Sequence, residues 1–246
     1  MEGYGSSSYG DAFADVYDEW YRGISDVDTT VAVLAELAGD GPLLELGVGT
    51  GRLALPLART TGVAVVGIDT SRAMLDLLAE RDRDGTVDVI VGDMVRDLPD
   101  GPFTMAFVAY NTLFNLLGDG EQRACFAAVA DRLVPGGRFV VEAFVPEDPP
   151  RRGDHLEIRE LTATCVVLSA SVHHPDDQTA EGQFIELTEA GGVRLRPWSV
   201  RYATPAQLDE MAAAAGLELE HRWSGFERSA FDDDASRHVS TYRKIR

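Results

Sequence analysis

The sequence predicts an α/β fold in which a parallel, helix-covered sheet carries an antiparallel β insertion and is preceded by an N-terminal helical segment. Short apolar runs alternate with helical stretches between residues 43 and 142, which is typical of βαβ units and a parallel sheet. Strand-like segments separated only by turns follow between residues 156 and 202, which favours antiparallel pairing. The chain is 246 residues long, with 45% hydrophobic and 26% charged residues, so it can bury a sizeable core.

The N-terminal segment predicts two helices. Aromatic and apolar side chains recur on one helical face over residues 11–21, with Asp11 as the expected N-cap. A second helix is expected from about Ser25 to Ala38, where Gly39 would end it. The side chains expected on the shared face of the first helix are Phe13, Val16, Tyr17, Trp20 and Tyr21.

The alternating region predicts five strands and three helices. The expected strands are 43–46, 63–68, 87–91, 103–110 and 138–142, and the expected helices are 52–59, 71–81 and 119–133. In such a sheet the carboxyl ends of the parallel strands lie on one common edge, where ligands bind.

A proline-rich break over 145–156 separates this region from the rest. The expected antiparallel strands are 156–161, 165–172, 184–188 and 193–202. Thr204 and Pro205 then open a helix that ends near Ala215, and strands 217–223 and 238–242 are expected to close the main sheet. We therefore divide the chain into an N-terminal lid (1–40), an α/β core (41–145), an insertion (146–203) and C-terminal closing elements (204–246).

Charge and composition exclude several classes of function. The net charge of −19 opposes binding to nucleic acids and to anionic membranes. No apolar run reaches membrane-spanning length and no secretory signal is present, so we expect a cytoplasmic protein. The two cysteines indicate neither disulfides nor a zinc site, and no residue cluster suggests any other metal. A homo-oligomer is compatible with the sequence.

The most informative stretch is Glu45-Leu46-Gly47-Val48-Gly49-Thr50-Gly51, which lies between an expected strand and an expected helix. Such a loop lets a ligand approach the backbone at a helix N-terminus. A nicotinamide-binding fingerprint would place its third glycine at i+5, where this chain has Arg52. The spacing therefore argues against a nicotinamide-dependent oxidoreductase, although a tight turn without a ligand stays open.

Two acidic residues reduce the weight of that alternative. Asp69 ends the second expected strand, where a carboxylate can accept hydrogen bonds from ribose hydroxyls. Asp93 ends the third strand, where it could bind an adenine amino group while Met94 covers the ring.

These motifs resemble those of the class I S-adenosylmethionine-dependent methyltransferases. ELGVGTG, GIDTS and VGDM match the family's first three motifs in order, and Pro135-Gly136-Gly137 matches its turn before strand five. The resemblance covers about residues 10–145 and implies a Rossmann-like sheet. It implies that the glycine loop holds the methionine end of S-adenosylmethionine, that Asp69 binds the ribose, and that Ala109 lies near the amino group. The cofactor-binding residues so expected are Tyr21, Glu45, Gly47, Gly49, Gly51, Asp69, Thr70, Gly92, Asp93, Met94 and Ala109.

The N-terminal tyrosines are similar to those of small-molecule N-methyltransferases of antibiotic biosynthesis, such as amino-sugar and lincosamide N-methyltransferases. In that subset the N-terminal helix covers the cofactor and the insertion covers the substrate. By this resemblance we expect Tyr9, Tyr17 and Phe114 to be catalytic, and Asn111 and Trp198 to bind the substrate. A packing role remains the alternative for the aromatic residues.

Methyl transfer to an amine mainly requires alignment and exclusion of water, and alignment alone can supply on the order of 7–11 kcal/mol. Neutral tyrosine hydroxyls can orient an amine without stabilising its protonated form. We therefore expect an S-adenosylmethionine-dependent N-methyltransferase acting on a small amine. O-methylation and a cofactor-binding protein without turnover remain alternatives. A base role for His221, His173 or His174 is disfavoured.

Overall fold

The computed structural model describes residues 1–23 and 26–245 and confirms the predicted α/β class. The helices are α1 (Ser8–Phe13), α2 (Tyr17–Trp20), α3 (Val27–Ala38), α4 (Ala54–Thr61), α5 (Arg72–Arg81), the 3₁₀ turn η1 (Thr112–Asn115), α6 (Glu121–Arg132) and α7 (Pro205–Ala214). The strands are β1 (Leu43–Leu46), β2 (Val65–Asp69), β3 (Val87–Val91), β4 (Phe103–Val108), β5 (Leu133–Phe144), β6 (Gly153–Leu161), β7 (Cys165–His174), β8 (Thr179–Thr188), β9 (Val193–Arg201), β10 (Leu217–Trp223) and β11 (Arg237–Lys244).

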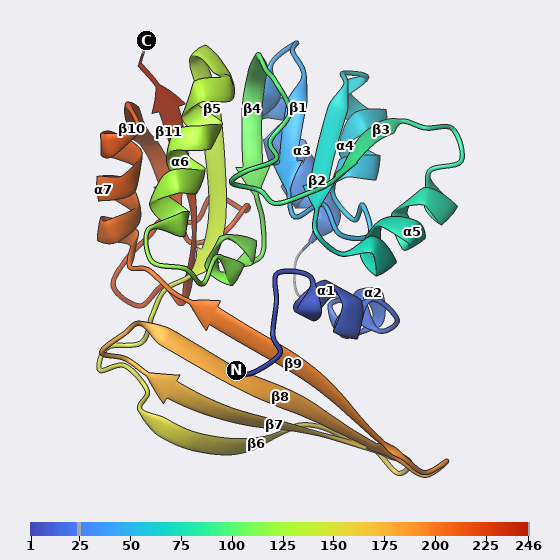
Figure 1. Ribbon diagram of the computed structural model, residues 1–246. Helices are drawn as coiled ribbons and strands as arrows, with labels where there is room; N and C mark the ends of the chain where they lie inside the picture. The colour runs from blue at the N-terminus through green and yellow to red at the C-terminus, as the bar shows by residue number, and fades with distance from the viewer. Residues whose placement is uncertain (24–25, 246) are drawn as a thin grey trace.

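Seven strands form the main sheet in the order β10-β11-β5-β4-β1-β2-β3 (Figure 1). The five strands from β1 to β5 run parallel, and β11 joins β5 antiparallel with β10 beyond it. The chain order reverses between β1 and β4, so loops from β1 and β4 diverge there and leave a crevice at the carboxyl edge.

Apolar side chains cover both faces of this sheet. One buried cluster joins α6 and α7 to the sheet through Phe126 and Leu208. The other joins α3, α4 and α5 through Leu34, Leu57 and Leu75. With helices packed on both faces, only the carboxyl edge of the parallel strands is left to present loops.

Three helices begin at side-chain caps. The Asp26 carboxylate accepts the Asp28 N–H before α3, and the Ser71 hydroxyl accepts the Met74 N–H before α5. Thr204 forms a full capping box with Gln207 at α7. Each cap satisfies backbone donors that have no partner inside the helix, so these starts follow from the residue types.

The insertion forms a second, four-stranded antiparallel sheet in the order β6-β7-β8-β9, which we call the roof sheet. It lies across the carboxyl edge of the main sheet, with α1 and α2 between them (Figure 1). Side chains alternate between its two faces, so Phe184 and Trp198 point inward while Ile185 and Leu195 point away.

The predicted single helix over 11–21 is wrong. The chain forms two short helices, α1 and α2, with a break at residues 14–16. The break turns Asp15 toward the roof sheet, where it pairs with Arg194 and Arg196. Asp11 is not a cap but lies within α1, where it accepts the Ser71 hydroxyl at 2.7 Å. The expected start of the next helix at Ser25 lies outside the described residues.

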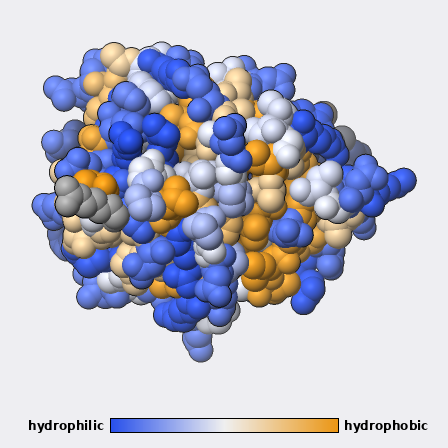
Figure 2. All heavy atoms as spheres, turned by 90° about the horizontal axis from the view of Figure 1, so that it is seen from above, coloured by the Kyte–Doolittle hydropathy of each residue, from blue (hydrophilic) through white to orange (hydrophobic). Residues whose placement is uncertain are grey.

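The surface seen from above is mostly hydrophilic, with smaller hydrophobic areas between (Figure 2). This agrees with the net charge of −19. Within the described ranges, no helix has the length and apolar character needed to cross a membrane.

Candidate active site

The glycine loop after β1 has backbone conformations that favour glycine, and at Gly47 it also lies close to a neighbouring side chain. Gly47 has φ +70° and Gly49 has φ +53°, values that L side chains rarely adopt. A Cβ at Gly47 would also collide with the Thr112 methyl group. The Asp69 carboxylate accepts the Gly49 N–H at 2.9 Å, which fastens the loop to the end of β2. The local sequence thus creates a rigid concave backbone surface.

Beside this loop lies a cavity of about 90 Å³, which we call the loop cavity. It collects side chains from α1, α2 and the ends of β1, β2, β3 and β4. Its lining residues are Ser6, Tyr9, Gly10, Tyr17, Gly47, Gly49, Ile68, Asp69, Thr70, Met74, Gly92, Met94, Thr112 and Asn115. It therefore contains six of the eleven residues expected at the cofactor: Gly47, Gly49, Asp69, Thr70, Gly92 and Met94.

Glu45 is a buried carboxylate directly behind the glycine loop. Burial raises its pKa to about 8, against the lowering effect of Arg52. Its Oε2 atom is buried and has no hydrogen-bond partner among the described residues. Together with Ala109 and Tyr17 it lines a small pocket of about 20 Å³. An unpartnered buried acceptor is costly, so this position fits a ligand that brings a donor or a positive charge.

Five residues expected at the cofactor do not line the loop cavity: Glu45 and Ala109, which line the pocket of about 20 Å³, and Gly51, Asp93 and Tyr21. Gly51 instead allows close packing of the loop, since a Cβ there would lie 2.9 Å from Leu78 Cγ. The Asp93 carboxylate is turned into its own loop, where it accepts the Val95 N–H at 2.8 Å and pairs with Arg96. Tyr21 faces the second cavity rather than the first.

The second cavity, of about 530 Å³, lies under the roof sheet; we call it the roof cavity. Aromatic side chains dominate its wall, and charged groups gather on the roof side. Its lining residues are Tyr9, Tyr17, Tyr21, Tyr110, Asn111, Thr112, Asn115, Phe144, Val145, Pro146, Glu147, Pro150, Arg151, Arg159, His173, Ala180, Phe184, Trp198, Val200, Tyr202 and Ser236. A volume of this size suits a small molecule or one end of a larger one.

Four tyrosines form one group between α1 and α2, which we call the lid helices, and the loop after β4. The hydroxyl oxygens of Tyr9 and Tyr21 lie 2.7 Å apart, and the ring of Tyr21 contacts those of Tyr17 and Tyr110. Burial raises the pKa of each of these hydroxyls. All four therefore stay protonated and uncharged at neutral pH.

The loop after β4 is held in a left-handed conformation at Tyr110 (φ 51°) and Asn111 (φ 65°). The Tyr110 N–H donates to Glu142, and the Asn111 side-chain oxygen accepts the Phe144 N–H at 2.6 Å. The Asn111 amide thus supports the loop in addition to facing the roof cavity. Burial raises the pKa of the Glu142 carboxyl, against the lowering effect of that backbone hydrogen bond.

Phe114 is not on either cavity wall. Its side chain is fully buried, and its ring packs edge-on against Phe144 with centroids 5.0 Å apart. Phe144 is the residue that faces the roof cavity. The 3₁₀ turn η1 explains the difference, because it points Phe114 into the core while Thr112 and Asn115 face outward.

The lid helices are tied down at two places. Arg196 on β9, itself buried, donates to the Ala12 carbonyl oxygen at 2.5 Å and pairs with Asp15 and Glu186. On the other side, Asp18 accepts the Thr50 hydroxyl at 2.9 Å next to the glycine loop. The two ties fix Tyr9 and Tyr17 between the two cavities.

Sequence reasoning found Tyr9, Tyr17, Asn111 and Trp198 on the roof cavity but missed most of its wall. The alternation of side-chain direction along the roof strands could have predicted part of this wall, because residues that share a face with Trp198 point into the cavity. His173, which follows the expected strand 165–172, is part of β7, and burial together with His155 and Arg151 lowers its pKa. Other lining residues come from segments without a motif.

Comparison with known proteins identifies the family. The sequence profile of the "Methyltransferase domain" family matches residues 43–137. The cypemycin N-terminal methyltransferase of Streptomyces sp is 33% identical over 220 residues, which is 83% of this chain and 87% of that protein. The chain belongs to the S-adenosylmethionine-dependent methyltransferases.

Solved methyltransferase structures share the whole architecture. The CcbJ methyltransferase from Streptomyces caelestis is 43% identical and superposes with a TM-score of 0.92 over 99% of this chain and 100% of that one. CalS10, an amino pentose methyltransferase from Micromonospora echinaspora solved with S-adenosylmethionine, gives a TM-score of 0.73 at 22% identity over 93% and 96% of the two chains. The latter likeness concerns the fold alone.

S-adenosylmethionine is the cofactor of this methyltransferase, and the side chains around the glycine loop, in the loop cavity and in the smaller pocket at Glu45, suit it. The free Oε2 of Glu45 offers an acceptor for the positively charged methionine end. Asp69 offers carboxylate oxygens for the ribose, with Met94 available to cover the adenine ring. Burial raises the pKa of Asp69, while three backbone N–H groups oppose that shift and favour the carboxylate.

Proposed function

We propose that this methyltransferase methylates an amine nitrogen of a small-molecule or peptide precursor in antibiotic or other secondary metabolism. The proposal rests mainly on the wall between the two cavities. Only Tyr9, Tyr17, Thr112 and Asn115 line both cavities within the described chain. We assign methyl transfer to this shared wall, whose side chains are uncharged and carry no strong base.

That composition suits an amine better than a hydroxyl acceptor. S-adenosylmethionine, when bound, supplies an electrophilic methyl group on a sulfonium. A neutral amine already has the attacking electron pair, so the protein needs only to orient it and exclude water. An alcohol oxygen becomes a comparable nucleophile only with a positioned base, usually a histidine or carboxylate.

The tyrosines are assigned matching roles. Tyr17 and Tyr9 each form a single hydrogen bond with the amine, either donating to its nitrogen or accepting its N–H. Unlike a carboxylate, they do not stabilise its protonated form. Their raised pKa values keep them neutral over the working pH range. Their ring faces also attract the positive charge on sulfur and nitrogen.

One relative supports the substrate class. This protein, 33% identical, is named for methylation of the N-terminus of cypemycin. The name specifies an amino terminus as the methylated group. The same chemistry on this chain is our proposal.

The test is release of S-adenosylhomocysteine from S-adenosylmethionine with a matched panel of amines and the corresponding alcohols. Turnover on amines that is lost in Asp69→Ala supports the proposal, with thermal melting to check that the variant folds. Turnover on alcohols alone would overturn it. Cofactor binding without any product would instead indicate a protein that binds the cofactor without catalysis.

A second candidate function, O-methylation, is favoured by one observation. His173 lines the roof cavity, and its lowered pKa keeps it unprotonated at neutral pH. A neutral imidazole could serve as the base for a hydroxyl acceptor. If His173→Gln abolished turnover while Tyr17→Phe had no effect, this candidate would replace the first.

A further inference from the structure

One charged side chain on the roof cavity has no role in the chemistry described above. Arg159 projects from the inner face of β6 and lines the cavity. Its guanidinium carbon lies 4.7 Å from the ring centroid of Phe184, 5.1 Å from that of Trp20 and 5.7 Å from that of Tyr21. An exposed arginine normally extends into water, but three aromatic rings hold this one against the cavity.

Four carboxylates of the lid and the insertion are paired with other arginines. Arg151 binds both Glu147 and Glu157. Asp15 and Glu186 are paired with Arg196. Within residues 1–23 and 26–245, no hydrogen bond or ion pair satisfies the Arg159 guanidinium.

A guanidinium held by its faces keeps its N–H edge free. That edge matches two oxygen atoms of a carboxylate or phosphate, which it binds in a bidentate manner. Stacking on rings also restricts the side chain before binding, so less conformational entropy is lost when an anion is bound. The wall thus offers a preformed site for an anionic oxygen group.

The position of this site relative to the reaction is also defined. Tyr21 contacts Arg159 through its ring, while its hydroxyl oxygen lies 2.7 Å from that of Tyr9 on the shared wall. Only one tyrosine side chain therefore separates the free guanidinium from the proposed amine position. Both groups could bind one compact acceptor.

We propose that the methyl acceptor carries an anionic oxygen group, a carboxylate or a phosphate ester, close to its amine, and that Arg159 binds this group. The inference rests on the proposed N-methylation and adds the substrate class. It also explains how an anion near the amine is tolerated: an anion alone would stabilise the ammonium form, whereas Arg159 neutralises it. A plain cationic amine would meet the Arg159 charge uncompensated.

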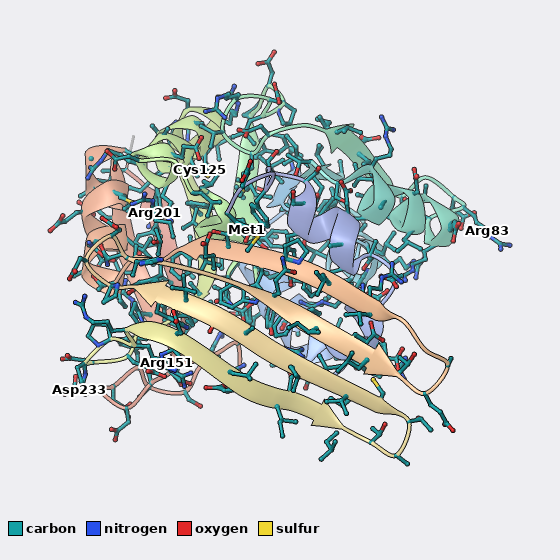
Figure 3. The ribbon with its side chains drawn as sticks, turned by 60° about the horizontal axis from the view of Figure 1, so that its bottom comes forward. Met1, Arg83, Cys125, Arg151, Arg201 and Asp233 are labelled. Carbon is teal, nitrogen blue, oxygen red and sulfur yellow. The ribbon has the colours of Figure 1, made fainter. Side chains whose placement is uncertain are left out.

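Arg152 provides a matched control. It is an exposed arginine of the same insertion that pairs with Asp176 and does not line the cavity. Figure 3 shows the neighbouring Arg151 where the chain enters the roof sheet. Arg152→Gln thus removes the same charge near the site without touching the wall.

The experiment is calorimetric titration of the full chain saturated with S-adenosylhomocysteine, so that no turnover is required. The probes are phenylalanine against phenylalaninamide, and 3-aminopropyl phosphate against 3-aminopropanol. We expect the anionic member of at least one pair to bind at least 10-fold more tightly. Arg159→Gln should abolish that preference, Arg159→Lys should keep part of it, and Arg152→Gln should leave it intact.

Several results would overturn the proposal. They are equal binding within both pairs, an anion preference that survives in Arg159→Gln, and no binding of any probe at millimolar concentration. A preference in the phenylalanine pair alone identifies a carboxylate, and one in the aminopropyl pair alone identifies a phosphate. Failure of N-methylation itself appears separately, in the product assay, because calorimetry does not depend on turnover.

Discussion

Arg196→Met should loosen the lid helices from the roof sheet. The Arg196 side chain is 1% exposed and joins three groups from two parts of the chain. On the lid it binds the Asp15 carboxylate at 2.6 Å and the Ala12 carbonyl oxygen, and on β8 it binds Glu186 at 2.9 Å. Methionine fills similar space but leaves these acceptors without their donor.

The magnitude follows from how buried each remaining group is. Removing one partner of a buried ion pair costs about 3–5 kcal/mol when the other charge stays buried. The Glu186 pair lies within the roof sheet and does not change when the lid opens. On the lid side, Asp15 is 40% exposed and keeps Arg194, so most of the penalty falls on the Ala12 carbonyl oxygen, which loses a hydrogen bond from a charged donor, worth about 1.5–3 kcal/mol. We therefore expect about 2–3 kcal/mol, which at about 1.4 kcal/mol per factor of ten is about a 30- to 140-fold shift toward lid opening.

Hydrogen exchange of the backbone amides in residues 8–21 measures this shift directly. The dissociation constant for S-adenosylhomocysteine should rise with it, because Tyr9 and Tyr17 line the loop cavity. Arg194→Met is the matched control, since its side chain is 58% exposed and its pair with Asp15 should contribute at most about 1 kcal/mol. Equal exchange rates in the two variants would refute the assignment of Arg196 as the anchor of the lid.

Three further outcomes are expected. Gly47→Ala should weaken S-adenosylhomocysteine binding at least 10-fold by calorimetry. Gly62→Ala should not alter this binding, because Gly62 has a similar φ of +67° but open space around it. Equal effects of the two substitutions would show that backbone strain alone, and not the close approach at Gly47, weakens cofactor binding. The pKa of Glu45 rises from 4.5 to about 8 on folding, so the folded state binds more protons and the free energy of unfolding should fall as pH rises from about 4.5 to 8. Urea titrations of Glu45→Gln should lack this fall in the free energy of unfolding. Parallel pH profiles for Glu45→Gln and the unsubstituted protein would contradict this assignment to Glu45. The pKa of His238 drops from 6.5 to about 4 through burial, so stability should be lost as pH falls through that range, and His238→Gln should be less sensitive to acid in the same titrations.

The α/β core was predictable because its signals are local. Apolar runs of strand length, glycines after β1 and acids at two strand ends depend on neighbouring residues and on one parallel sheet edge. The expected strands and helices of this region appear within a few residues of their expected bounds. Gly47, Gly49 and Asp69 lie together beside the loop cavity because the topology leaves them no other edge.

The misplaced residues depend on contacts that sequence spacing does not encode. Phe114 turns inward because η1 is a 3₁₀ turn, whose side-chain directions differ from those of an α-helix. Asp93 forms a local turn with the Val95 and Arg96 N–H groups, a competing use that short acidic residues often find. The break in the predicted 11–21 helix depends on Arg196, about 180 residues further along the chain.

That separation has a consequence for how the protein is made. Tyr9 and Tyr17 leave the ribosome early, whereas Arg196, which holds their helices, is translated only after most of the chain has emerged. The main sheet is likewise incomplete until β10 and β11 are made, since β11 lies between β5 and the edge. Contacts of such long sequence range form slowly, because much of the chain has to be ordered before they form. The parallel strands β1 to β5 can therefore pair during synthesis, while the lid and the antiparallel edge of the main sheet are completed later. A nascent chain has no enclosed cofactor site until the roof is in place.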